Sequence, residues 1–237
     1  MFRSAIENGL ECEILHYEWG RAYCRFFDFE KAQDEFTITL QNYPQHLDAK
    51  IGLALINAYK GNFELVDELK EVNGSSVFIQ EAVGLERLHN GLVEDAVEMF
   101  KKALRTDKKQ TYNYLNLARA FQKLGNRDKT KEYFEKFTGE NPWYLDGLLE
   151  YSQWLITDGN IADAQRKLRK AEKIAPNNIE VLNLLFFTSY TLVKDNICEY
   201  NIKEALMIAE KVQSLGKFQY NQERLELETI LNTMQGK

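Results

Sequence analysis

The chain has 237 residues, of which 44% are hydrophobic and only three are prolines, so it should form a folded core rather than a disordered segment. Its formal net charge of −6 argues against non-specific binding to nucleic acid. Polar residues interrupt its most apolar stretch, residues 181–193, which leaves no run of the roughly 18 uncharged apolar residues that a membrane helix needs. No membrane insertion is expected.

The N-terminal residues contain no apolar segment of the kind found in a cleaved secretion signal, so a cytoplasmic location is expected. The three cysteines, Cys12, Cys24 and Cys198, lie far apart and form no C-x-x-C motif. This spacing fits a reducing compartment. We expect each cysteine to be a small, partly buried apolar residue rather than a metal ligand or a nucleophile.

Glycines and prolines at regular intervals along the chain indicate an internal repeat. Glycines recur at equal intervals, at Gly91, Gly125 and Gly159. Pro142 and Pro176 are separated by the same interval, and each follows the preceding glycine of this series by half of it. Pro44 follows Phe27 by the same half interval, so all three prolines obey one register.

Apolar residues at helical spacing, such as Tyr114, Leu117 and Phe121, lie between these marks and predict two helices for every interval. The glycines stand where a first helix should end, and we expect Gly125 and Gly159 to adopt left-handed cap conformations. The prolines should end the second helix, because proline lacks the backbone N–H and clashes with the preceding turn.

The repeat carries the pattern W-x2-L-G-x2-Y, then A-x3-F, then P, and therefore resembles the tetratricopeptide family. Residues 13–46 show it most fully, with a changed order of the large residues: Trp19, Gly20, Tyr23, Ala32, Phe36 and Pro44. Residues 111–144 and 145–178 follow it as well. Their small residues at the position of Gly20 are Ala118 and Ser152, which should mark close crossings of paired helices.

The other units are less regular. Residues 47–76 predict a shortened second helix, residues 77–110 have Lys108 in place of the proline, and residues 179–219 contain an insertion near 195–201. A final amphipathic helix at about 222–235 is expected to cap the array. Phe2 and Ala5 either cap its other end or belong to a preceding repeat. We predict a single repeat domain over residues 1–237.

The resemblance implies an all-α, right-handed superhelical solenoid of antiparallel helix pairs, whose first helices line a concave groove for partners. The groove positions that packing within the repeat does not use are Tyr17, Arg21, Cys24, Arg25, Ile51, Leu55, Tyr59, Glu81, Leu85, Leu88, Tyr112, Leu115, Arg119, Lys123, Leu149, Gln153, Ile156, Asn183, Phe187 and Tyr190. Many are apolar, which favours an apolar partner segment. Alternatively, neighbouring first helices cover the leucines.

Four cations on this surface, Arg21, Arg25, Arg119 and Lys123, predict a partner with acidic residues on either side of apolar anchors. The last two belong to residues 101–136, the only basic part of the chain. In the alternative, carboxylates within the chain, such as Glu18 and Glu81, neutralise these cations.

No pattern of catalytic residues is visible, because His16, His46 and His89 fall in different units without an adjacent nucleophile. Phosphate-binding glycine loops are also absent. We therefore expect no enzyme, no metal and no cofactor, and interpret the chain as a scaffold or adaptor that binds a protein or peptide. A chaperone for a secretion or assembly substrate, a sensor of short peptides, and self-association remain alternatives.

Overall fold

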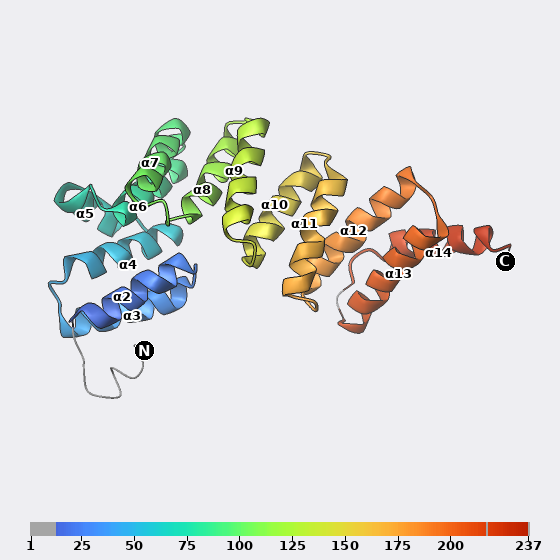
Figure 1. Ribbon diagram of the computed structural model, residues 1–237, viewed down its shortest axis with the longest axis horizontal. Helices are drawn as coiled ribbons and strands as arrows, with labels where there is room; N and C mark the ends of the chain where they lie inside the picture. The colour runs from blue at the N-terminus through green and yellow to red at the C-terminus, as the bar shows by residue number, and fades with distance from the viewer. Residues whose placement is uncertain (1–12, 217, 237) are drawn as a thin grey trace. The chain divides into compact units, whose positions relative to one another are not determined.

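The structure is a computed structural model that describes residues 13–216 and 218–236 (Figure 1). Phe2, Ala5 and Cys12 lie outside these residues. The described residues form 13 α-helices and no strand, which confirms the all-α fold class. None of these helices is both long and apolar enough to cross a membrane.

The chain divides into two compact units, Met1–Glu140 (unit 1) and Asn141–Lys237 (unit 2). Unit 1 contains four helix pairs: α2 (Glu13–Arg25) with α3 (Phe29–Asn42), α4 (Leu47–Tyr59) with α5 (Glu64–Asn73), α6 (Val77–His89) with α7 (Val93–Thr106), and α8 (Tyr112–Lys123) with α9 (Arg127–Glu140). Unit 2 contains α10 (Leu145–Thr157) with α11 (Ile161–Ile174), α12 (Ile179–Asp195) with α13 (Glu199–Ser214), and a final helix α14 (Asn221–Met234). The single continuous domain stays a prediction.

Close packing explains the small residues of the repeat. A Cβ atom added to Gly20 of α2 would lie 2.5 Å from Cε1 of Phe36 on the paired helix α3, and Gly52 of α4 approaches the same ring from the next pair. Gly84 of α6 meets Phe100 of α7 at 2.5 Å in the same way. The glycines therefore let one aromatic ring fill the space between neighbouring helices.

The turns follow the predicted register. Gly125 and Gly159 have φ angles of 67° and 81°, which confirms the left-handed caps at the ends of α8 and α10. Phe27 occupies the corresponding place between α2 and α3, with φ at 62°. A non-glycine residue costs about 1–2 kcal/mol in this region, so other contacts must hold Phe27 there.

Each unit has its own hydrophobic core. In unit 1, the rings and small residues of the first three pairs form one cluster around Phe36. In unit 2, Leu182, Phe186 and Leu227 belong to a second cluster, and α14 contributes Leu227 to it. The predicted apolar face of the last helix is thus confirmed, except that Met234 is exposed.

Candidate partner-binding surfaces

A buried polar network joins the first helices of three successive pairs in unit 1. Glu81 of α6 is 0% exposed, and the hydroxyl of Tyr59 on α4 donates a hydrogen bond to its Oε1. Nδ2 of Asn113 on α8 donates to Oε2 of Glu81 at 2.9 Å, and Nδ2 of Asn116 donates to the Tyr59 hydroxyl oxygen at 2.9 Å. These bonds tie α4, α6 and α8 together on the side that was predicted to line a groove.

Burial dominates the chemistry of this network. It raises the pKa of Glu81 to about 7, although the hydrogen bonds from Tyr59 and Asn113 act in the opposite direction. The pKa of Tyr59 is raised well above its usual value, first by burial and then by the nearby carboxylate of Glu81. The pKa of the Cys24 thiol is also raised by burial, so this cysteine is poorly suited to act as a nucleophile.

An aromatic cluster closes the same side of unit 1. The ring of Phe27 lies 4.9 Å from that of Tyr112 and 5.7 Å from that of Phe137, measured between centroids. Phe29 stacks on Tyr59 at 4.7 Å, and Tyr59 meets Tyr112 edge to face at 5.2 Å. The turn between α2 and α3 therefore packs against α8 and α9, so the first pair of unit 1 contacts its fourth.

This closure corrects the expectation that the groove residues of unit 1 are open to a partner, because seven of them are buried: Cys24, Ile51, Leu55, Glu81, Leu88, Tyr112 and Leu115. Leu55 and Leu115 are 0% exposed, Tyr112 is 7% exposed and Leu88 is 9% exposed. The first helices α4, α6 and α8 contact one another in unit 1, which agrees with the alternative that the leucines are covered within the chain. Tyr17, Tyr59 and Leu85 are partly buried and pack against the core of unit 1.

The cations near the start of unit 1 have partners within the chain. Nη1 of Arg21 lies 2.8 Å from Oε1 of Glu18, and its guanidinium lies 5.6 Å from the ring centroid of Tyr17. Arg25 reaches Oδ2 of Asp107 at 3.6 Å. This last contact again joins the end of α2 to the segment that precedes α8.

The two cations of α8 are also engaged. The guanidinium of Arg119 lies 5.7 Å from the ring centroid of Tyr112. Nζ of Lys123 donates to the backbone carbonyl oxygen of Leu88 at 3.3 Å, although this lysine is otherwise exposed. The proposal of an acidic partner at these four cations stays a prediction.

Unit 2 has an open pocket on α12, with a volume of about 460 Å³. It lies between the N-terminal half of α12 and the segment that leads into α14. Its lining residues are Ile179, Glu180, Asn183, Leu184, Gln219 and Tyr220. The mixture of apolar walls and a few polar groups is typical of a site that binds a side chain or a small molecule.

Contacts with α12 hold the wall formed by residues 218–220 in place. The backbone N–H of Gln219 donates to Oδ1 of Asn183 at 3.3 Å. The ring of Tyr220 lies 5.8 Å from Phe186 and 5.7 Å from Phe187, between centroids. The pKa of Tyr220 is raised, chiefly because it is partly buried. The pocket is therefore a built feature of the fold.

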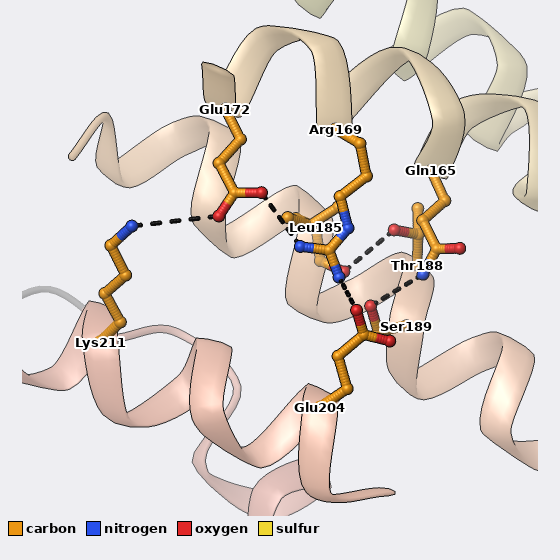
Figure 2. Close-up of polar contacts among 8 residues, drawn as sticks. All are labelled: Gln165, Arg169, Glu172, Leu185, Thr188, Ser189, Glu204 and Lys211. Atoms are coloured by element: carbon orange, nitrogen blue, oxygen red, sulfur yellow. Dashed lines mark hydrogen bonds and ion pairs between the residues drawn. The ribbon is translucent and has the colours of Figure 1, made fainter. Parts of the chain in front are cut away.

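A polar network links α11 to both α12 and α13 in unit 2 (Figure 2). Arg169 of α11 lies between Glu172 of its own helix, at 3.0 Å, and Glu204 of α13, at 2.5 Å. Nε2 of Gln165 on α11 donates to the hydroxyl of Ser189 on α12 at 2.9 Å. The ion pairs join α11 to α13, the Gln165–Ser189 bond joins α11 to α12, and α12 also packs against α13.

The two sides of α12 thus have separate roles. Leu185, Thr188 and Ser189 are buried on the side that meets the polar network. Leu184 and Phe187 lie on another side and are only partly buried. Because residues three and four apart share a helix face, Leu184 and Phe187 extend the pocket along α12.

Two predicted groove residues of unit 2 lie beside this pocket. Nε2 of Gln153 on α10 donates to Oε1 of Glu180 at 3.0 Å, and Phe187 contacts Tyr220. Asn183 is among the groove residues predicted from the sequence, whereas the other lining residues of the pocket are not. A useful signal was the pair of aromatic residues, Phe218 and Tyr220, just before the last helix.

The histidines have structural contacts. Nδ1 of His16 lies 2.6 Å from Oε2 of Glu35, and Nδ1 of His46 accepts the backbone N–H of Ala49 at the start of α4. The ring of His89 lies 5.3 Å from that of Phe63. Within the described part of the chain, no group of three or more His, Cys, Asp or Glu residues could hold a metal ion.

Comparisons with known proteins identify the repeat. Residues 112–142 match the model of the tetratricopeptide repeat family. PilW, a type IV pilus biogenesis factor, has 18% identity and a TM-score of 0.61, with 92% of this chain and 98% of that chain covered. PilF of Pseudomonas aeruginosa has 16% identity and a TM-score of 0.59, with 92% and 96% covered.

Cut9, from the APC/C hetero-tetramer Cut9–Hcn1, shares the fold at 15% identity and a TM-score of 0.57, over 93% of this chain and 43% of that chain. No curated protein matches the sequence. Identities this low establish the fold alone. The resemblance to the tetratricopeptide repeat family is nevertheless confirmed, directly for the repeat at residues 112–142 and through the helical solenoid fold for most of the chain.

Proposed function

We propose that the protein is a non-catalytic scaffold or adaptor that binds a segment of another polypeptide in the pocket on α12. The observation that supports this proposal most directly is the pocket, where Leu184 and Tyr220, together with the adjacent Phe187, are partly exposed on the side of unit 2 formed by its first helices. Repeat proteins of stacked helix pairs commonly bind partners on such surfaces. The wide spacing of the three cysteines along the sequence supports our proposal of a reducing, cytoplasmic location.

The size of the pocket suits an apolar anchor residue. A buried aromatic side chain removes about 150–250 Å² from water, which is worth roughly 5 kcal/mol at about 25 cal/mol per Å². Ordering of the partner and loss of its free motion offset most of this gain. One anchor therefore supports weak binding, and contacts along Phe187 and neighbouring residues are needed for a stable complex.

The experiment is affinity capture with the wild-type protein and two variants. Leu184→Arg places a charge in the pocket, whereas Leu92→Arg changes an exposed leucine in unit 1, far from the pocket residues in sequence. We expect partners captured by the wild type to be lost with Leu184→Arg and kept with Leu92→Arg. Equal capture by both variants would show that the pocket is not the binding site.

The identity of the captured proteins separates the roles that share this pocket. One folded partner in a stable ratio supports a scaffold. Many unfolded clients support a chaperone for a secretion or assembly substrate, the second role predicted from the sequence. Binding only of short peptides supports a peptide sensor.

A further inference from the structure

Two carboxylates have no cationic partner among the described residues: Glu180 in the lining of the pocket, and Glu223 in the first turn of α14 just after it. Glu180 is exposed, and its side chain accepts a hydrogen bond from the neutral amide of Gln153. Glu223, in the first turn of α14, lies close enough to raise the pKa of Tyr220 in the pocket wall. No ion pair within the described part of unit 2 therefore neutralises Glu180 or Glu223.

Other carboxylates of α14 differ in this respect. Glu226 lies 3.4 Å from Nζ of Lys194 and accepts a hydrogen bond from the Tyr190 hydroxyl at 2.5 Å. Glu228 lies 2.8 Å from the guanidinium of Arg224. Glu226 and Glu228 thus have partners within unit 2, whereas Glu180 and Glu223 have no cationic partner among the described residues.

A structural role for these two carboxylates is the alternative, since acidic residues stabilise the N-terminal turn of a helix. Each helix N-terminus corresponds to roughly half a positive charge. The first turn of α12 is already capped by Asn178, whose Oδ1 accepts the N–H of Val181 at 3.0 Å. Asn178 thus supplies the side-chain cap of α12, so Glu180 is not needed for that role.

We propose that the pocket on α12 selects a partner segment in which a lysine or arginine stands next to an apolar anchor residue. The inference rests on the proposed function of this pocket. The anchor would contact Ile179 and Leu184, while the cation would pair with Glu180 of the pocket lining or with Glu223 in the first turn of α14. Charge pairs at the edge of an apolar pocket contribute specificity and speed association. This preference is opposite in sign to that predicted for the cations of unit 1.

The test uses an array of heptapeptides with a fixed central phenylalanine or leucine and random flanking residues. It compares the wild type with Glu180→Gln/Glu223→Gln, and with Glu226→Gln/Glu228→Gln as a matched control of equal charge change. All four positions are at least partly exposed, so the variants should fold. We expect lysine and arginine to be enriched about three- to tenfold over acidic residues beside the anchor.

This enrichment should disappear in the first variant and persist in the control. Binding without a charge preference, or a preference that survives Glu180→Gln/Glu223→Gln, would overturn the inference and leave the pocket as a binding site. If Leu184→Arg binds the same peptides as the wild type, or if no peptide binds, the proposed function itself fails.

Discussion

Units 1 and 2 are built from the same kind of helix pair, yet they use the inner side of the first helices differently. In unit 1, Leu115 and Glu81 are completely buried there, and the first pair packs against the fourth. In unit 2, Leu184 and Phe187 remain partly exposed beside a pocket. The repeat pattern therefore specifies how helices pair, whereas individual side chains decide whether a binding surface stays open.

One turn residue illustrates how a single position changes this outcome. Where later repeats have Gly125 or Gly159, the first pair has Phe27 in the same left-handed conformation. Glycine would relieve the backbone strain but would leave no ring to fill the space against Tyr112 and Phe137. The closure of unit 1 thus depends on a residue that departs from the repeat pattern.

The largest expected effect on stability comes from replacing a leucine by alanine, which should have different consequences in the two units. Leu115→Ala should destabilise the protein by about 2–5 kcal/mol, because it leaves a cavity in a completely buried site. Leu184→Ala should cost about 1 kcal/mol or less, since this side chain is only partly buried. Urea unfolding of both variants measures the difference. Equal losses of unfolding free energy would remove the distinction between a closed and an open surface.

The next effect concerns pH and applies only to unit 1. The folded-state pKa of Glu81, about 7, lies above the ordinary value of 4.5, so its protonated form is favoured in the fold. The contribution of Glu81 to the free energy of unfolding is therefore fully present below about pH 4.5 and is lost as the pH rises through 7. The loss is on the order of 3 kcal/mol.

Glu81→Gln tests this linkage because glutamine does not titrate. Relative to the wild type, the variant should gain stability between pH 5 and pH 8, as measured by urea midpoints across that range. Glu223→Gln, a change of a half-exposed carboxylate in unit 2, is the control and should show a much smaller slope difference. A parallel pH profile for Glu81→Gln and the wild type would contradict the assignment.

A smaller effect is expected at the turn that closes unit 1. Phe27→Gly relieves about 1–2 kcal/mol of backbone strain but removes a buried ring worth about 3–5 kcal/mol, so the net loss should be about 1–4 kcal/mol. Gly125→Ala introduces backbone strain without removing a contact, so its loss of stability measures the contribution of the strain alone. Thermal unfolding measures both. Stabilisation by Phe27→Gly would mean that the aromatic cluster does not hold the first pair in place.

Much of the fold could be predicted from the sequence. The glycine and proline register located the turns, and apolar spacing located the helices, because both depend on local geometry. Prolines 44, 142 and 176 do follow the ends of α3, α9 and α11. The conformation at Gly125 was predicted for the same reason.

The binding surface was harder to predict because it depends on contacts between repeats. The position of Leu115 on a first helix suggested exposure, but the side chain is 0% exposed in unit 1, where the first helices contact one another. The pocket residues Gln219 and Tyr220 belong to an irregular segment outside the repeat pattern. Their role follows from the hydrogen bond to Asn183 and from ring packing, which spacing alone does not reveal.

Thiol accessibility tests most directly whether unit 1 is closed and unit 2 is open. Cys24, a predicted groove residue of unit 1, is 1% exposed, and burial also raises its thiol pKa. The measurement compares two proteins that contain one thiol each. In Cys12→Ser/Cys198→Ser the remaining thiol is that of Cys24, and in the second protein Leu184→Cys supplies the thiol after the three native cysteines have been replaced. The rate of reaction with a thiol reagent is measured for both. In concentrated guanidinium the two thiols should react at similar rates. In native buffer we expect Cys24 to react at least about a hundredfold more slowly, because it must wait for local opening. Equal native rates would contradict the account.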